Sequence, residues 1–440
     1  MSDAVTLQLN MEKEASEIIK VLTGHGFQAY FAGGYVRDLL FNKPVKDIDI
    51  ATSALPEEVM GLFAHTAPTG LQHGTVTVMM KVHAFEVTTF RTESDYVQKR
   101  RPGKVEFVSS LEEDLKRRDF TINAMALGLD GQLIDPFHGK QDLQDLILRC
   151  VGNPIDRFNE DALRMMRCLR IASEYGLEVE EETWKALMIT GPALKHIAME
   201  RIRVELEKMV EGSFPHKAIE LLAASKLIKY FKVDAGLTLE NFEYTLQYNL
   251  IDLPRIDNKE ARWVYLFILM GMQAGKARET LHKLTFAKRK IDYIHKLLVS
   301  HEWIRVHMEH SSEWNWRDWV QSTIQFGKAA VTSWLTIVPF LNAANLNSTN
   351  DNLVWLRDFN EEKLHETVDI IQGVTVETVS DLKISGEDLL KIHPFPGVWI
   401  KEILDRLLID VAFKLLPNRK EQLLAKALFY YQTEKSSTHE

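Results

Sequence analysis

The sequence has few features of secreted or membrane proteins. Only two cysteines, Cys150 and Cys168, occur in 440 residues, which is too few for a disulfide framework or a thiolate metal cage and indicates a reducing compartment. No uninterrupted run of about 18 apolar residues is present, and the first residues show no basic region followed by an apolar one. We therefore expect a cytoplasmic protein without a membrane partner.

The chain also lacks an excess of basic charge. It carries 62 acidic and 53 basic residues, for a formal net charge of −9, so any anionic partner must be held locally. With 45% hydrophobic and 26% charged residues, the composition is that of a globular protein and excludes disorder, collagen and coiled-coil arrays. The length corresponds to roughly two to four domains.

Apolar periodicity divides the chain into a mixed first third and a helical remainder. Strand patterns occur near residues 28–32, 47–51, 75–81 and 84–90, and helical patterns near 11–25, from Gly34 and over 56–63. From about residue 156, helical spacing dominates, as over 158–175, 200–211 and 216–228. This pattern predicts a mixed sheet flanked by helices, followed by a mostly helical remainder.

The segment Gly33-Gly34-Tyr35-Val36-Arg37-Asp38 connects a predicted strand to a predicted helix. Glycines let the backbone approach an anion, and the first N–H groups of the helix point toward it. Arg37 adds charge-assisted donors. These features outline a phosphate-binding turn, although a Gly-Gly pair can equally make a simple strand-to-helix turn.

Two aspartates follow on the next predicted strand, in Asp47-Ile48-Asp49-Ile50-Ala51-Thr52. Residues two apart on a strand share a face, so Asp47 and Asp49 point the same way while the isoleucines enter the opposite, apolar layer. The two carboxylates repel each other unless a divalent cation lies between them, and oxygen ligands favour Mg²⁺. The alternative is an acidic edge strand that faces solvent.

Together, residues 33–38 and 47–52 resemble the head-domain signature of the class II tRNA nucleotidyltransferase and poly(A) polymerase family, within the polymerase-β-type superfamily. The resemblance implies an α+β fold, in which a nucleotidyltransferase head with a mixed sheet precedes a helical neck, body and tail. We expect the catalytic head at 1–150, the base-selecting neck at 151–213, the body at 214–300 and a tRNA-binding tail at 301–440.

Two further blocks match the family in order. Residues 117–124, Arg-Arg-Asp-Phe-Thr-Ile-Asn-Ala, resemble its second head motif, and residues 160–167, Glu-Asp-Ala-Leu-Arg-Met-Met-Arg, resemble its base-selecting Glu-Asp-x-x-Arg motif. The resemblance implies that the phosphate, ribose and base are contacted by residues of both blocks and by an arginine just after the second, namely Arg118, Asp119, Asn123, Asp161, Arg164, Arg167 and Arg170.

Hydrogen-bond chemistry explains how Asp161 and Arg164 could perform the base selection that the resemblance implies. On one continuous helix these residues would lie a turn apart. Cytosine and adenine each offer an amino donor beside a ring-nitrogen acceptor, which match a carboxylate and a guanidinium respectively. Uracil and guanine place a carbonyl oxygen where the amino group would be, and such a mismatch can cost a factor of roughly 10⁴.

The family resemblance thus predicts a template-independent enzyme that uses Mg²⁺, CTP and ATP to add C, C and A to the 3′ end of tRNA, in a two-metal reaction that releases pyrophosphate. Glu86 is a candidate third carboxylate, for the metal or for the attacking hydroxyl. Residues 200–207 resemble a fifth family motif, but their alternating charges also suit any exposed helix, so we leave them out of the predicted site.

Three other functions remain open. A poly(A) polymerase of this family typically carries a basic Gly-Arg-Arg-Phe-type segment after the first motif, whereas residues 68–75 read Pro-Thr-Gly-Leu-Gln-His-Gly-Thr. A CC-adding enzyme is disfavoured by residues 91–104, a polar segment that we expect to be mobile and that occupies the place of the family's loop for switching from C to A addition. A catalytically silent RNA-binding protein would tolerate loss of Asp47 or Asp49, yet both are present.

Overall fold

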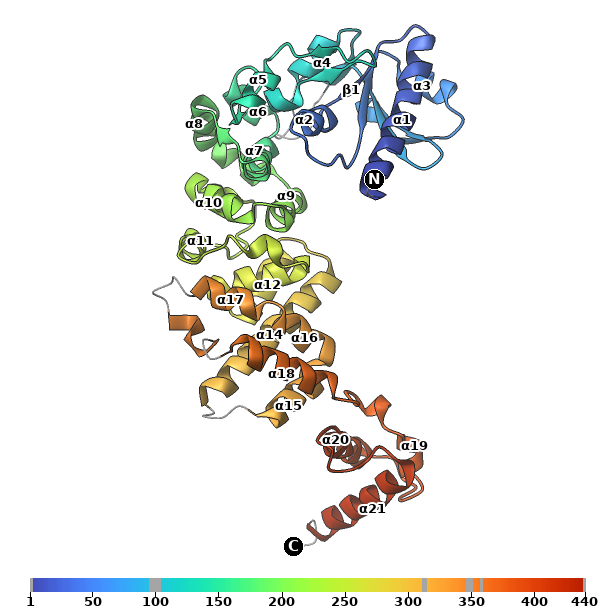
Figure 1. The fold of residues 1–440 in the computed structure, drawn as a ribbon, viewed down its shortest axis with the longest axis vertical. Helices are drawn as coiled ribbons and strands as arrows, with labels where there is room; N and C mark the ends of the chain where they lie inside the picture. The colour runs from blue at the N-terminus through green and yellow to red at the C-terminus, as the bar shows by residue number, and fades with distance from the viewer. Residues whose placement is uncertain (1–2, 95–103, 311–314, 346–350, 357–358, 438–440) are drawn as a thin grey trace. The chain divides into compact units, whose positions relative to one another are not determined.

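The computed structural model describes residues 3–94, 104–310, 315–345, 351–356 and 359–437. The chain forms two compact units (Figure 1). The first comprises Met1–Leu239 with Lys283–Thr285, and the second comprises Glu240–His282 with Phe286–Glu440.

A mixed sheet of seven strands forms the centre of the first unit, in the order β3-β4-β5-β2-β1-β8-β9. Its strands are β1 Ala29–Ala32, β2 Asp49–Thr52, β3 Thr66–Gly70, β4 Thr75–Met79, β5 Ala84–Thr89, β8 Ala126–Leu127 and β9 Leu133–Ile134. Strand β2 pairs in parallel with β5 and antiparallel with β1. Because β2 lies between these two neighbours, the alternative of an acidic edge strand is wrong.

The two faces of the sheet differ in chemistry. Phe31, Ile50, Phe85 and Val87 are buried in one core cluster together with residues of α1, Asp3–Gly24, and of α3, Pro56–Leu62. Because side chains alternate along a strand, Asp49 faces the other side, where its register partner on β5 is Glu86. The apolar face therefore anchors the strands and leaves carboxylates on the face that forms the site.

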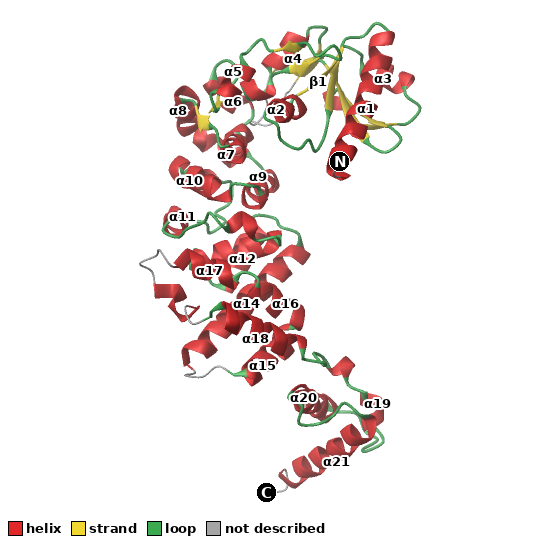
Figure 2. Cartoon of the chain, in the orientation of Figure 1, coloured by secondary structure: helices red, strands yellow, loops and turns green. Residues whose placement is uncertain are grey.

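Short strands and helices complete the first unit (Figure 2). Two small two-stranded sheets pair β6 Arg91–Ser94 with β7 Lys104–Phe107, and β10 Ile147–Leu148 with β11 Glu178–Val179. The remaining helices are α2 Gly34–Leu40, α4 Leu111–Lys116, α5 Gly139–Gln144, α6 Pro154–Glu160, α7 Leu163–Tyr175, α8 Glu181–Thr190, α9 Met199–Glu211 and α10 Pro215–Ser225.

The second unit is built from helices throughout its described residues, apart from turns and loops (Figure 2). Their bounds are α11 Leu239–Thr245, which begins at the unit boundary, α12 Lys259–Leu269, α13 Ala274–Lys283, α14 Lys288–His310, α15 Trp316–Phe326, α16 Lys328–Leu335, α17 Val338–Asn345, α18 Glu361–Gln372, α19 Gly386–Leu389, α20 Val398–Ala412 and α21 Lys420–Ser437. Leucines and isoleucines of α20, such as Ile403 and Leu407, are fully buried in an apolar cluster with Leu423 of α21.

The predicted fold, a mixed sheet with helices followed by a mostly helical remainder, is confirmed, with two local corrections. The strand predicted at 47–51 begins only at Asp49, so Asp47 precedes it. The helix predicted over 158–175 is interrupted between α6 and α7. The segment 91–104, which we expected to be mobile, pairs at its two ends as β6 and β7, and residues 95–103 lie outside the described residues.

Cys150 and Cys168 are both buried, and neither forms a disulfide in the structure. Among the residues that the structure describes, no single helix has both the length and the apolar character needed to cross a membrane. One pair of helices, Trp316–Phe326 with Lys328–Ala344, has them only when taken together, and it is bent by 117°.

Candidate active site

A polar cavity of about 560 Å³ in the first unit gathers all the predicted site residues. Its lining comprises Ala32, Gly33, Gly34, Arg37, Asp47, Asp49, Ile50, Thr75, Glu86, Thr88, Arg91, Arg117, Arg118, Asp119, Asn123, Asp161, Leu163, Arg164, Arg167, Arg170 and Arg201. Arginines outnumber carboxylates in this lining, so a chain of net negative charge concentrates positive charge at one site.

Asp47 and Asp49 open into this cavity from the same side of their segment. Both side chains are exposed, whereas Ile48 and Ile50 between and after them are 3% and 1% exposed. The alternation predicted from the sequence therefore holds, although Asp47 lies just before β2 rather than within it.

The surroundings of Asp49 raise the pKa of its carboxyl group. Desolvation by the surrounding protein, followed by the Asp47 carboxylate, raises the pKa of Asp49 to about 6, and Glu86 adds to the increase while Arg118 and Arg37 oppose it. Desolvation is therefore the largest cause of the raised pKa, and the acidic neighbours add to it. A raised carboxylate pKa marks a place where additional positive charge would be stabilising.

The donor set suits a divalent cation that is shared with a substrate. Asp47 and Asp49 supply carboxylate oxygens, the ligands that Mg²⁺ prefers. Among the described residues, no group of three or more His, Cys, Asp or Glu side chains is arranged to hold a metal ion. The two aspartates therefore fit an ion that takes its remaining oxygens from water and a bound phosphate, and Glu86 does not complete a protein-only metal site.

Gly33 lies between the carboxylates and an arginine. It has a φ of 65° and caps α2, a backbone conformation that favours glycine. A Cβ atom at this position would lie 2.8 Å from Arg118 Nη1 and 3.6 Å from Asp49 Oδ2. The glycine therefore permits the close approach of Arg118 to the turn, as the predicted phosphate-binding turn requires.

Arg37, on α2, is held in place by its neighbours. Its Nε and Nη2 atoms each donate to Asp38 Oδ1 at 3.0 Å, and Nη1 donates to Asn123 Oδ1. The guanidinium also lies 4.4 Å from the centre of the Tyr175 ring, whose hydroxyl donates to Asp38. These contacts fix the guanidinium at the cavity wall.

Asp119 joins the second head motif to α7. Arg167 donates to Asp119 Oδ2 from Nε at 2.8 Å and from Nη2 at 2.6 Å, while Asn123 donates to Oδ1 at 2.9 Å. Burial alone would raise the pKa of Asp119, but Arg167 and Asn123, with Arg164, outweigh it and lower the pKa below its usual range. The structure thus places Asp119 as the partner of two other predicted nucleotide contacts.

Arg118 and Arg170 are also paired with protein groups. Arg118 donates to Asp114 Oδ2 at 3.2 Å and to the Asn123 carbonyl at 3.3 Å. Arg170 donates to Glu205 at 2.5 Å and to Glu174 at 3.0 Å, so it takes part in an ion-pair network within the protein.

Asp161 and Arg164 do not lie on one continuous helix, which corrects the predicted geometry. Asp161 follows α6 in an extended conformation, with φ −133° and ψ 104°, and its Oδ1 accepts from the Leu163 amide at 3.1 Å. Such a local bond between an aspartate and the amide two residues later competes with helix continuation. Arg164 donates to Glu160 at 2.7 Å and to the Arg117 carbonyl at 3.0 Å.

Arg201 is a cavity residue that the sequence interpretation missed. It belongs to α9 and donates to both oxygens of Asp161. Its signal was the resemblance of residues 200–207 to the fifth family motif, which we set aside because alternating charges are common on exposed helices.

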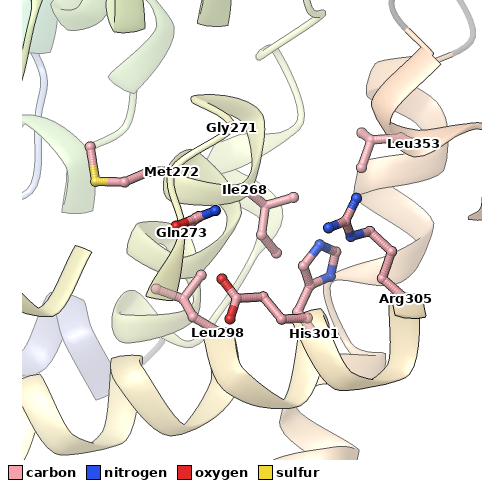
Figure 3. A pocket seen from close by; sticks show the side chains of 9 residues that line it. Ile268, Gly271, Met272, Gln273, Leu298, His301, Arg305 and Leu353 are labelled. Carbon is pink, nitrogen blue, oxygen red and sulfur yellow. The ribbon is translucent and has the colours of Figure 1, made fainter. Parts of the chain in front are cut away.

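A second cavity, of about 250 Å³, lies in the second unit between α12, α14 and Leu353 (Figure 3). His301, Glu302 and Arg305 line it beside Ile268 and Leu298. Glu302 accepts from the Ala274 amide at 2.6 Å, and burial lowers the pKa of His301 to about 3. This second cavity contains none of the predicted site residues.

Family models match most of the chain. Residues 29–149 match the poly A polymerase head domain, residues 176–233 match a probable RNA and SrmB-binding site of polymerase A, and residues 255–427 match a putative tRNA nucleotidyltransferase domain 2. The first match includes both aspartates and the Gly33 turn.

Individual relatives match over nearly the whole length. The CCA-adding enzyme of Bacillus cytotoxicus is 36% identical, covering 93% of this chain and 96% of the relative, and that of Geobacillus sp. strain WCH70 is 38% identical, covering 93% and 95%. The crystal structure of the Bacillus stearothermophilus CCA-adding enzyme in complex with CTP has a TM-score of 0.80 and 34% identity, covering 99% of this chain and 100% of that one. The chain therefore belongs to the CCA-adding enzymes, a family of tRNA nucleotidyltransferases.

Proposed function

We propose that this protein adds C, C and A to the 3′ end of tRNA, using CTP and ATP without a nucleic-acid template and releasing pyrophosphate. The observation that carries the proposal is the single cavity in which Asp47 and Asp49 face the Gly33 turn and a set of arginines. The matched relatives, which are named CCA-adding enzymes, support the same activity.

Asp47 and Asp49 are the residues that would hold Mg²⁺, in keeping with their exposed oxygens and with the raised pKa of Asp49. When bound, the ion lowers the pKa of the RNA 3′-hydroxyl and neutralises charge on the triphosphate. Glu86, in register with Asp49, is available to accept a proton from that hydroxyl.

The triphosphate is held by this chain's own donors. Gly33 and Gly34 bring the backbone close to the phosphates, and Arg37 and Arg118 supply charge-assisted hydrogen bonds beside them. Because these donors are fixed by Asp38, Asn123 and Asp114, they meet the developing negative charge with little reorganisation. Arg167 and Arg170 also contact the nucleotide in this proposal, after exchanging part of their carboxylate contacts.

Base selection falls to Asp161 and Arg164. Asp161 accepts from the exocyclic amino group of cytosine or adenine, and Arg164 donates to the adjacent ring nitrogen. Asp119 and Asn123 position Arg167 and the ribose side of the nucleotide. UTP and GTP would set an acceptor against the Asp161 carboxylate and leave buried polar groups unpaired.

We assign the catalytic head to residues 1–150, the neck to 151–213, the body to 214–300 and the tRNA-binding tail to 301–440. We further propose that the protein works in the cytoplasm, where its two free, buried thiols would stay reduced.

The test is extension of a tRNA that lacks its 3′ terminus, with labelled CTP and ATP, in the presence of Mg²⁺. The expected product is tRNA ending in CCA. Long A tails would instead identify a poly(A) polymerase, a stop after CC would identify a CC-adding enzyme, and no extension with retained tRNA binding would indicate a binding protein.

A further inference from the structure

The carboxylate of Asp161 is held by a residue outside the base-selecting motif. Arg201, on α9, donates from Nη1 to Oδ1 at 3.2 Å and from Nη2 to Oδ2 at 2.8 Å. The side chains of Arg201 and Asp161 are 28% and 18% exposed, respectively, and both line the cavity. This is a two-point contact at the cavity wall rather than a surface ion pair.

Two parallel hydrogen bonds determine the plane of a carboxylate as well as its position. A contact with one oxygen alone would leave the Asp161 carboxylate free to rotate about its last torsion angle. Asp161 has no regular helix around it to limit this rotation, because it lies in the break between α6 and α7. Arg201 therefore supplies an orientation that the local backbone does not.

The contacts also distinguish the two oxygens of Asp161. Oδ1 accepts from Arg201 Nη1 and from the Leu163 amide. Oδ2 accepts from Arg201 Nη2. A carboxylate offers about four acceptor directions, two on each oxygen, so, among the described residues, the partners of Asp161 leave one direction on Oδ2.

We infer that Arg201 is a specificity-positioning residue, which holds Asp161 so that Oδ2 accepts the amino group of the incoming cytosine or adenine. This inference rests on the proposed function. Arg201 acts through Asp161 and contacts neither the base nor the reacting atoms. Removing it loosens the recognition of the base and leaves the triphosphate contacts of the Gly33 turn in place.

The test compares variants of the full chain by their preference for CTP over UTP, measured as the ratio of kcat/KM values in tRNA extension. In Arg201→Met we expect this ratio to fall at least about tenfold, because a mobile carboxylate discriminates poorly between an amino group and a carbonyl. Arg201→Lys should give a smaller fall, because one ammonium cannot hold both oxygens in a parallel pair.

Arg203→Met is the matched control. Arg203 lies on the same helix, pairs with Glu207 of that helix and is not among the cavity-lining residues. We expect its CTP preference to stay within about twofold of the wild type. If Arg201→Met fails to fold, as judged by thermal unfolding, Arg201→Lys decides the question by the same ratio.

A double-mutant cycle separates positioning from a merely structural role. In an Asp161→Ala background, Arg201→Met should change the CTP preference by less than about twofold, because the group through which it acts is gone. The inference would be overturned if Arg201→Met lowered the CTP preference by the same factor with and without Asp161. It would also be overturned if the CTP preference were unchanged in Arg201→Met and Arg201→Lys. Either result would leave CCA addition intact. A wild-type chain that extends no tRNA would refute the proposed function, and this inference with it.

Discussion

Replacement of Gly33 by alanine tests the phosphate-binding turn with a single methyl group. At φ 65° and ψ −128°, Gly33 lies outside the left-handed helical region, and alanine there costs about 1–3 kcal/mol through backbone strain. The added Cβ would also lie 2.8 Å from Arg118 Nη1, so the guanidinium must move. Displacing one charge-assisted hydrogen bond to phosphate costs about 2 kcal/mol, or roughly a 30-fold loss of kcat/KM for CTP.

Gly176→Ala is the control for the backbone contribution. Gly176 also has a φ of 65°, with a ψ of 30° in the left-handed helical region, and a Cβ there has nothing within 4 Å, so alanine should cost stability without disturbing the cavity. Gly176→Ala should lower the thermal midpoint by about 2–4 °C and Gly33→Ala by at least as much, whereas only Gly33→Ala should lose activity in steady-state tRNA extension. Equal kcat/KM values for the two variants would refute the proposed role of the turn.

Two further predictions concern the charges of the cavity. Asp49→Asn should abolish extension yet raise the thermal midpoint of the ligand-free protein at pH 7.5, because it removes a charged carboxylate that is partly desolvated and is repelled by Asp47 and Glu86. Since the folded-state pKa of Asp49 is raised to about 6 from 3.8, its stabilising contribution is complete below about pH 4 and is lost as the pH rises through 6. The difference in thermal midpoint between Asp49→Asn and the wild type should therefore be smaller at pH 5 than at pH 7.5. A difference that does not change with pH would contradict the raised pKa of Asp49. Asp119→Ala should lower the free energy of unfolding by about 3 kcal/mol in urea titrations at pH 7, because it leaves Arg167 and Asn123 without their shared carboxylate. The lowered pKa of Asp119 means that this stabilisation is present above about pH 4 and lost as the pH falls below it, so an equal loss at pH 3 and pH 7 would count against the ion pair.

The sequence predicted the chemistry of the site better than its local geometry. Alternation of Asp47, Ile48, Asp49 and Ile50 placed both carboxylates on one face, because a buried apolar layer fixes which way a strand points. This alternation could not reveal that the strand starts at Asp49. Side chains also alternate along extended backbone that makes no hydrogen bonds to a neighbouring strand.

The elements that the sequence pattern missed are short or depend on tertiary contacts. Strands β8 and β9 have two residues each, too few to show a period. The break before α7 depends on the bond from the Leu163 amide to Asp161, and the helical pattern of apolar residues continues across it. Arg201 reaches Asp161 across 40 positions, a pairing that no local pattern encodes.

The central claim is that Asp47 and Asp49 coordinate a divalent ion beside the bound nucleotide. It is tested most directly by electron–nuclear double resonance of Mn²⁺ with CTP and the full chain labelled with ¹³C at its aspartate carboxylates. We expect ¹³C coupling to Mn²⁺ when CTP is present, and loss of this coupling in the Asp47→Asn, Asp49→Asn double variant. Absence of this coupling in the wild type, or its persistence in the double variant, would contradict the claim.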